Sequence, residues 1–175
     1  MKKVILFSSI TLILIISTCI MLYIFLFPLK YTNQIETCSQ KYKLPSSLIA
    51  SIINVESGYN KNAISKANAK GLMQLLDSTA DEIALKLNCS NYDIFNIETN
   101  IEFGCYYLSY LLNLYDNDLK LALCAYNAGL TNVNNWIKNS NYYNGKTLVK
   151  IPFKETENYI KKIKLNSFIY SLKYR

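Results

Sequence analysis

The chain begins with one long apolar segment. No charged residue lies between Val4 and Leu29, and scattered Ser and Thr are the polar residues of this run. Even if it ended at Pro28, a helix of this length would measure roughly 36 Å, more than the ~30 Å hydrocarbon core of a bilayer. The run is longer than the apolar part of a cleavable signal peptide, and no A-x-A-like cleavage site follows it. The pattern predicts that residues 1–29 are an uncleaved signal anchor containing a transmembrane helix.

The next part of the chain changes from polar to helical. Residues 30–43 are mostly polar and are expected to form a linker. After them, Pro45 and two Ser open an apolar pattern of helical period, and Gly58 follows it, which is typical of the two ends of a helix. This predicts a helix from about Ser46 to Ser57.

Two further helices are predicted from capping motifs at their starts. Ser78-Thr-Ala-Asp81 has the pattern of a capping box, and apolar residues at helical spacing follow it. Thr99-Asn-Ile-Glu102 opens another pattern, whose apolar stripe continues for four turns. Both motifs therefore predict the first turn of a helix.

The rest of the chain is also helical in pattern. Asp118 is expected to cap a helix that ends at Gly129, and two more patterns lie around residues 132–138 and from residue 154 to the C-terminus. Neither strand alternation nor an internal repeat is found. With 175 residues there is room for one domain of ordinary size, so the sequence predicts an all-α domain of about six short helices.

Charge is unevenly distributed along the chain. The formal net charge is +7, but residues 31–150 hold ten Lys and ten acidic residues, whereas residues 151–175 hold six basic and two acidic residues. The neutral body argues against a nucleic-acid-binding protein. The basic tail is typical of contact with anionic lipid or wall polymer, or of a solvated helix face.

Cysteine and histidine content limits the chemistry. Cys19 lies in the apolar run, and Cys38, Cys89, Cys105 and Cys124 could form two disulfides in three different ways outside the cytosol. Their spacing is not that of a metal cluster. The chain has no His, which excludes Ser-His and Cys-His nucleophile systems and His-containing metal sites. Catalysis would have to use carboxylates, hydroxyls and amides.

Glu56 is the carboxylate with the most unusual position. In its predicted helix it lies on the same side as Ile49, Ile52 and Ile53, the side expected to face the core. Burial disfavours the charged form and would raise its pKa, as a general acid at neutral pH requires. The simpler alternative is a Glu that turns to solvent or pairs with a Lys at the end of the helix.

Four short motifs follow one another along the chain. They are Glu56-Ser57, Gly-Leu-Met-Gln at 71–74, Ala-Tyr-Asn-Ala-Gly at 125–129 and Glu-Thr-x-x-Tyr at 155–159. In this order and at this spacing they resemble the signature of soluble lytic transglycosylases of the goose-lysozyme-like group. The resemblance covers residues 44–163. It implies an all-α, lysozyme-like transglycosylase domain, which we expect over residues 44–175.

The resemblance also implies roles for individual residues. Glu56 matches the single catalytic acid/base of the family. The residues that match substrate-binding positions are Ser57, Gly71, Met73, Gln74, Tyr126, Asn127 and Tyr159. Simpler structural roles are a helix end for Ser57, a turn for Gly71, a surface amide for Gln74, and core packing for the Met and the two Tyr.

The mechanism implied by the resemblance uses one carboxylate, whereas most glycosidases use two. The other acidic residues near the motifs are Asp77, Asp81, Glu82 and Glu155, and none has the pattern of a partner. Glu56 would protonate the oxygen of the β-1,4 bond between MurNAc and GlcNAc and then accept the C6 hydroxyl proton, leaving a 1,6-anhydroMurNAc end. Such an enzyme is a lyase without cofactor or metal. The alternatives are a goose-type lysozyme hydrolase and a peptidoglycan-binding protein without turnover.

The implied substrate also sets the expected location. The Lys residues on the two sides of the apolar run leave the positive-inside bias nearly balanced. Peptidoglycan glycan strands lie outside the cytoplasmic membrane, so residues 33–175 are expected outside and residues 1–3 inside. This predicts a single-pass membrane protein with an extracytoplasmic catalytic domain.

Overall fold

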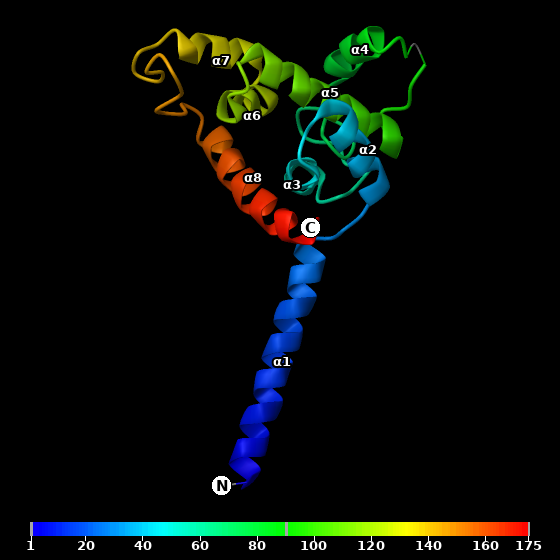
Figure 1. Ribbon diagram of the computed structural model, residues 1–175, viewed down its shortest axis with the longest axis vertical. Helices are drawn as coiled ribbons and strands as arrows, with labels where there is room; N and C mark the ends of the chain where they lie inside the picture. Colours follow the sequence, from blue (N-terminus) through cyan, green and yellow to red (C-terminus); the bar gives the residue numbers. More distant parts are fainter. Residues whose placement is uncertain (1, 90, 175) are drawn as a thin grey trace. The chain divides into compact units, whose positions relative to one another are not determined.

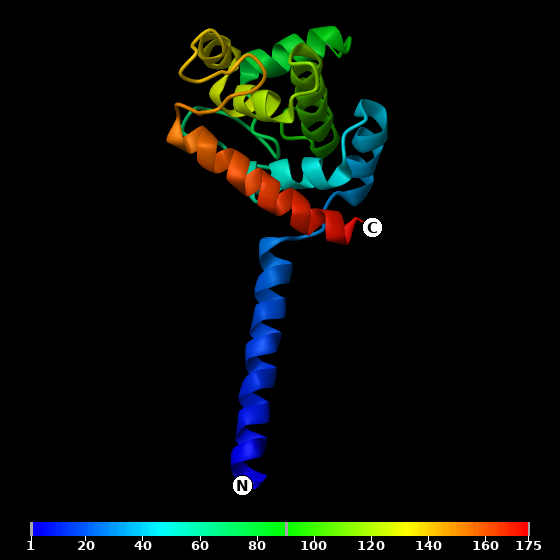
Figure 2. The ribbon, with the colours of Figure 1, turned by 60° about the vertical axis from the view of Figure 1, so that its left-hand side comes forward.

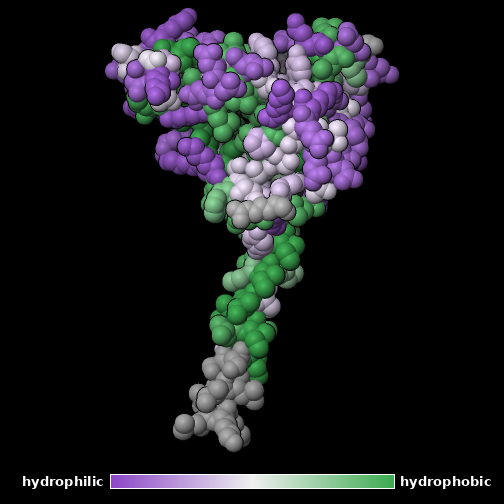
Figure 3. Space-filling model, viewed as in Figure 1, coloured by the Kyte–Doolittle hydropathy of each residue, from purple (hydrophilic) through white to green (hydrophobic). Residues whose placement is uncertain are grey.

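The computed structural model describes residues 2–89 and 91–174, and the side chains of residues 10–89 and 91–174. It contains two compact units, Met1–Lys30 and Tyr31–Arg175. The first unit consists of helix α1, Lys2–Leu26, whose side chains are exposed and largely apolar from Ile10 onward (Figure 3). Among the helices of the described residues, none is both long enough and apolar enough to cross a membrane. The predicted transmembrane span is therefore not confirmed, and its first nine side chains lie outside the described part of the chain.

The second unit is built from helices. Their bounds are α2 Thr32–Tyr42, α3 Ser46–Ser57, α4 Asp77–Lys86, α5 Ile97–Leu114, α6 Leu119–Ala128, α7 Leu130–Ile137 and α8 Lys154–Lys173. Within residues 31–89 and 91–174 the only β contacts are three isolated bridges, in the segments 64–75 and 143–148. The predicted all-α class is confirmed.

The core of this unit forms where α3 packs against the C-terminal helix α8, as Figures 1 and 2 show. Ile49, Ile52 and Ile53 of α3 are completely buried, and Ile160 and Ile163 of α8 are almost completely buried. On the other sides, α5 packs against α2, α4 and α6. Burial of this apolar surface fixes α3, and with it the position of its last turn, at the centre of the unit.

Two predicted helix ends are confirmed. Helix α3 has the predicted bounds Ser46–Ser57, with extended Pro45 before it and Gly58 in the left-handed conformation (φ 58°) after it. The carboxylate of Asp118 accepts hydrogen bonds from the backbone N–H groups of Lys120 and Leu121 at the start of α6. Both are local signals, so they could be recognised without knowledge of the tertiary structure.

The two predicted capping boxes are wrong. Helix α4 starts one residue before Ser78, at Asp77, and no side chain caps it. The cap of α5 is Asn96, whose side chain accepts a hydrogen bond from Thr99 N–H, so the helix starts earlier than Thr99. In both cases a partner elsewhere in the fold takes the acidic residue of the motif: Tyr92 donates to Asp81, and Lys41 and Tyr42 donate to Glu102.

The predicted linker over residues 30–43 is also wrong, because most of it forms helix α2 within the second unit. Ile35 and Cys38 are buried, at 0% and 6% exposure, where α2 packs against α3 and α5. A stripe of two buried residues on an otherwise polar helix is too narrow to stand out in the hydropathy pattern.

Candidate active site

The Glu56 carboxyl lies in the last turn of α3. It follows the fully buried Ile52 and Ile53, and Glu56 itself is half-buried. Burial raises its pKa from 4.5 to about 7, the Tyr159 hydroxyl opposes this rise, and the like charge of Glu155 adds to it. At neutral pH a large share of the Glu56 carboxyl is therefore protonated and able to donate a proton.

Two phenols lie near this carboxyl: the partly buried Tyr126 on α6 and the buried Tyr159 on α8. Burial raises the pKa of both well above 10, and the charge of Glu56 adds to the rise. The Tyr126 hydroxyl donates a hydrogen bond to the carbonyl oxygen of Met73 at 2.9 Å. The Tyr159 hydroxyl forms no hydrogen bond with the described residues, but it is near enough to Glu56 to favour the ionised carboxylate. Both phenols remain neutral donors at pH 7.

A second carboxylate lies within electrostatic range of Glu56. Glu155 is exposed in the first turn of α8, one turn before Tyr159, and its charge contributes to the raised pKa of Glu56. The sequence pattern gave no reason to choose Glu155 over the other acidic residues. Proximity to Glu56 depends on how α8 packs against α3, which residue spacing does not specify.

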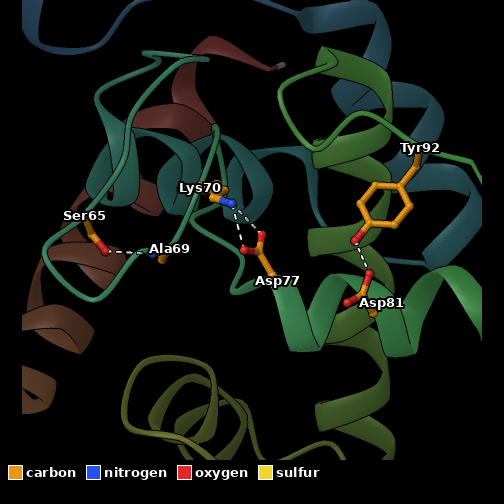
Figure 4. A network of polar contacts seen from close by, with 6 residues as sticks. All are labelled: Ser65, Ala69, Lys70, Asp77, Asp81 and Tyr92. Carbon is orange, nitrogen blue, oxygen red and sulfur yellow. Dashed lines mark hydrogen bonds and ion pairs between the residues drawn. The ribbon is translucent and has the colours of Figure 1, made fainter.

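Two of the other acidic residues have partners of their own, which Figure 4 shows. Asp77 forms an ion pair with Lys70, with Nζ 2.7 and 2.8 Å from its two oxygens. Asp81 accepts a hydrogen bond of 2.6 Å from the Tyr92 hydroxyl. The first contact joins the two ends of the loop that carries residues 71–76, so Asp77 stabilises the loop beside the site.

This loop approaches helix α5 closely. Gly71 has φ 79°, and a Cβ atom there would lie 2.1 Å from Nδ2 of Asn100, so only glycine fits. Met73 is completely buried, and its backbone N–H donates to Oδ1 of Asn100 at 2.8 Å. The Asn100 amide also donates to the carbonyl oxygens of Lys70 and Ile94. A buried amide thus fixes the loop.

Asn100 lies outside the four sequence motifs. Its signal is an amide one turn before Phe103 and Gly104, on a face of α5 that is otherwise apolar. Gly104 is also needed for the close approach, because a Cβ atom there would lie 2.3 Å from the sulfur of Met73. Together these contacts show that Gly71 and Met73 have structural roles.

Gln74 and Ser57 are also held by backbone groups. Gln74 has φ 50°, and its side-chain amide donates to the carbonyl oxygens of Gly71 at 2.8 Å and Ala63 at 3.2 Å. The Ser57 hydroxyl donates to the carbonyl oxygen of Leu72 at 2.8 Å. This hydrogen bond joins the end of α3, and therefore Glu56, to the loop. A direct contact of either side chain with substrate remains a prediction.

Asn127 joins α6 to α8 rather than pointing at Glu56. Its Oδ1 accepts a hydrogen bond of 2.8 Å from the hydroxyl of Thr156, a buried residue with 1% exposure that sequence analysis did not identify. Farther along α8, the Asn166 amide donates to Asn54 on α3 at 2.7 Å. These two contacts fix the helix that carries Tyr159 against the helices that carry Tyr126 and Glu56.

The predicted residues are therefore brought together around Glu56. The two tyrosines lie near its carboxyl. Ser57 forms a hydrogen bond with the loop that contains Gly71, Met73 and Gln74. Asn127 accepts a hydrogen bond from Thr156 and so helps to position α8. Among the described residues, no group of three or more Asp, Glu or Cys side chains is placed to hold a metal ion. The arrangement is chemically suited to proton transfer by one carboxyl supported by neutral hydrogen-bond donors.

Lytic murein transglycosylases from several bacteria are similar in sequence to more than half of this chain. The chain is 32% identical over 143 residues to the soluble lytic murein transglycosylase of Escherichia coli K12, which covers 78% of this chain and 22% of that protein. It is 36% identical over 116 residues to membrane-bound lytic murein transglycosylase C of Photorhabdus laumondii, which covers 59% of this chain and 32% of that protein. The chain thus spans about a fifth to a third of the length of these relatives.

Solved structures agree with these matches. An inactive mutant of lytic transglycosylase Slt from Pseudomonas aeruginosa has a TM-score of 0.76 and 29% identity, over 85% of this chain and 25% of that chain. The 70-kDa soluble lytic transglycosylase of Escherichia coli has a TM-score of 0.72 and 30% identity, over 81% and 24%. The fold is therefore the all-α, lysozyme-like fold of these transglycosylases.

The family model described as Transglycosylase SLT domain matches residues 33–149. This range contains Glu56, the loop of residues 71–74, and Tyr126 with Asn127, and it ends before Tyr159. It also contains nearly all of α2, in agreement with the place of this helix in the second unit. The chain belongs to the Transglycosylase SLT domain family.

Proposed function

We propose that this protein is a peptidoglycan lytic transglycosylase and that Glu56 is its catalytic acid/base. The observation that carries the proposal is the half-buried Glu56 carboxyl with a pKa of about 7, near two neutral phenols. Membership of the family, and relatives named as lytic murein transglycosylases, support the substrate.

The proposed reaction needs one carboxyl in two protonation states. Protonated Glu56 gives its proton to the oxygen that leaves C1 of MurNAc, and this C1–O bond to GlcNAc breaks. The acetamido group of the substrate stabilises the positive charge that develops at C1. The Glu56 carboxylate then accepts the C6 hydroxyl proton while O6 bonds to C1, which gives a 1,6-anhydroMurNAc end and restores the enzyme. A pKa of about 7 makes both protonation states accessible at neutral pH.

The surrounding residues support this cycle in different ways. The nearby Tyr159 hydroxyl lowers the pKa of Glu56 and so favours the carboxylate, the form that accepts the C6 proton. Tyr126 and Ser57 hold the loop of Gly71, Met73 and Gln74 by its carbonyl oxygens, and this loop borders the glycan strand. Asn127 positions α8 through Thr156.

A hydrolase of the goose-lysozyme type is the second candidate, because a specific observation favours it. Glu155 is exposed, and it lies near enough to Glu56 to raise its pKa. A second carboxylate near the bond could activate a water molecule, as in inverting glycosidases. The product would then be a reducing end in place of an anhydro end.

Product analysis tests the two candidates directly. Purified full-length protein is incubated with peptidoglycan sacculi, and the released muropeptides are weighed by mass spectrometry. We expect anhydro ends, which are lighter than reducing ends by one water. The Glu155→Gln variant should give the same product, whereas a hydrolase would give reducing ends and would lose activity in this variant. The Glu56→Gln variant measures the background.

We also propose that the N-terminal helix anchors the protein to the cytoplasmic membrane, with residues 33–175 outside. The charge-free run from Val4 to Leu29 and the exposed apolar side chains from Ile10 onward support this. Alkaline carbonate extraction of membranes from cells that express the full chain tests it. The chain should stay in the membrane pellet, and its release into the supernatant would contradict the anchor.

A further inference from the structure

Helices α2 and α5 pack with their cysteines at the interface. Cys38 lies in the middle of α2 with 6% exposure, and Cys105 in the middle of α5 with 0%. One turn before Cys38, the Gln34 amide donates to the Glu98 carboxylate at 2.9 Å. The contact of these helices therefore begins on the N-terminal side of the cysteines and includes both of them.

Contacts on the other side of Cys38 complete this alignment. The ring of Tyr42, one turn after Cys38, meets the ring of Tyr106 edge-on with centroids 6.1 Å apart. Lys41 forms an ion pair with Glu102, which also accepts a hydrogen bond from the Tyr42 hydroxyl. Cys38 is thus held between polar and aromatic contacts that fix the two helices in one register.

The two sulfur atoms interact with each other. A hydrogen bond from the Cys105 thiol and, to a smaller extent, the charge of Lys41 lower the pKa of Cys38, and together they outweigh burial and the charge of Glu102, which raise it. Burial raises the pKa of Cys105, which therefore keeps its proton. Of the two thiols, Cys38 therefore ionises more readily and is the one suited to attack first.

A cavity of about 290 Å³ lies beside Cys38. Its wall includes Cys38 together with Gln34 and Lys41 of α2 and Glu98 and Glu102 of α5. Cys105 is absent from this wall and is completely buried. A reagent that enters the cavity would therefore meet Cys38 before Cys105.

The other cysteines of the second unit lack this arrangement. Cys124 is buried in α6, where burial raises its pKa to about 12, so that its thiolate is scarce at neutral pH. Cys89 is half-buried beyond the end of α4, and its sulfur lies 3.9 Å from the carbonyl oxygen of Asn91. Among the cysteine pairs of the second unit, the structure therefore favours Cys38–Cys105 alone.

We propose that Cys38 and Cys105 are a disulfide-forming pair that joins α2 to α5 covalently in an oxidising environment. The oxidant is itself a disulfide. The Cys38 thiolate attacks one of its sulfurs, the S–S bond of the oxidant breaks, and the second oxidant sulfur leaves as a thiolate. Cys105 then loses its proton, attacks the Cys38 sulfur, and displaces the first oxidant sulfur. Two cysteine thiols are oxidised, and one oxidant disulfide is reduced to two thiols, which take up the protons.

The bond would have a structural consequence for the site. It would close a loop over residues 39–104, which contains α3 with Glu56 and the loop of residues 71–76. Closing so long a loop restricts the unfolded chain and stabilises the folded one. This inference does not depend on the proposed enzymatic activity, because it concerns thiols and thermal stability alone.

The first measurement maps the bond. Full-length protein is oxidised with glutathione disulfide, remaining thiols are alkylated under denaturing conditions, and the chain is cut with trypsin and a glutamyl protease, which separates Cys89 from Cys105 at Glu98 and Glu102. Non-reducing mass spectrometry should find the Cys38 and Cys105 peptides linked, two hydrogens lighter than their sum, with Cys89 and Cys124 alkylated. A link of Cys38 to Cys89 or Cys124, or alkylation of both Cys38 and Cys105, would overturn the proposal.

The second measurement follows stability. Oxidation of the wild-type chain should raise its Tm by roughly 10 °C, and dithiothreitol should reverse the rise. The Cys38→Ser and Cys105→Ser variants should lose the shift, while the matched controls Cys89→Ser and Cys124→Ser should keep it. Because the wild type is compared with itself, the test works even if a variant folds poorly. An unchanged wild-type Tm, or a shift that persists without Cys38, would contradict the proposal.

Discussion

The end of helix α3 and the start of helix α8 each carry a glutamate, and the two side chains meet opposite surroundings. Glu56 is half-buried, and burial raises its pKa to about 7. The carboxylate of Glu157 accepts hydrogen bonds from Nζ of Lys161 at 2.5 Å and Nζ of Lys154 at 2.9 Å, and these contacts lower its pKa to about 2. The same functional group is therefore shifted in opposite directions within one fold.

The difference shows how two kinds of environment arise. The partners of Glu157 lie three and four residues away on the same helix face, so the helix alone brings them together. The surroundings of Glu56 come from α6 and α8, which follow it in the chain by many residues. Only packing of the helices produces the environment of Glu56. Of the two environments, only this one excludes enough water to raise the pKa of a carboxyl to about 7.

The largest expected effect separates the two glutamates by activity. Glu56→Gln keeps the size of the side chain but cannot transfer a proton, so we expect kcat/KM for muropeptide release to fall by about 10³-fold. Glu157→Gln is the matched control, and its kcat/KM should stay within about twofold of wild type. If Glu56→Gln kept more than a tenth of the activity, another residue would have to be the acid.

The second effect concerns stability. The folded pKa of Glu56 is raised from 4.5 to about 7, so its contribution to the free energy of unfolding is fully present below pH 4.5 and is lost as the pH rises through 7. The shift corresponds to about 3 kcal/mol at 1.36 kcal/mol per pKa unit. Glu56→Gln should therefore be more stable than wild type by up to this amount at pH 8 and not at pH 4. Urea denaturation at both pH values measures the difference, and an equal difference at both would argue against a buried carboxylate.

The third effect is a shift of the pH profile. Wild-type kcat/KM should fall tenfold per pH unit above about pH 7, because the ionised Glu56 cannot donate. Tyr159→Phe removes a group that lowers this pKa and should move the descent upward by roughly half a pH unit, whereas Glu155→Gln removes a like charge and should move it downward by a similar amount. A shift of both variants in the same direction would exclude the assignment of this pKa to Glu56.

The smallest effect should be found at Glu157, the glutamate held by two exposed lysines. The lowered pKa of Glu157 gives a stability contribution that is present above pH 4.5 and is lost as the pH falls through 2. Its partners are solvent-exposed, so Glu157→Gln should change the Tm at pH 7 by less than about 2 °C. NMR titration in 1 M salt should return the pKa toward 4.5, because screening weakens exposed ion pairs. A pKa that did not change with salt would contradict the assignment of the lowered pKa to these two ion pairs.

Sequence patterns predicted the fold where signals are local or stripes are wide. The bounds of α3 and the Asp118 cap of α6 follow from neighbouring residues and are confirmed. The linker prediction failed at α2, because Ile35 and Cys38 are its only buried residues. The capping boxes failed at Asp81 and Glu102, whose carboxylates found partners in other segments.

The sequence predicts which residues form the site, and that remains a prediction, but it did not indicate the contacts that they make in the structure. Glu56 was recognised from its position on an apolar helix face, and the other residues from ordered motifs. The motifs do not indicate the contacts of these residues. The hydroxyls of Tyr126 and Ser57 donate hydrogen bonds to backbone carbonyl oxygens of the loop of residues 71–76, and Asn127 accepts a hydrogen bond from Thr156. Asn100, which fixes this loop, was missed because a single amide in a helix does not indicate which backbone groups it will meet.

By itself, the sequence determined the helical class, the ends of helices with strong local signals, and the spacing that places Glu157 between two lysines. The sequence left open whether Glu56 turns to solvent, and only the tertiary structure decided that it is half-buried, which acidic residue lies near it, and which two of the cysteines interact. The physical reason is that periodicity determines which face of a helix is buried, whereas burial, charge and reactivity depend on the neighbours that other helices bring to that face.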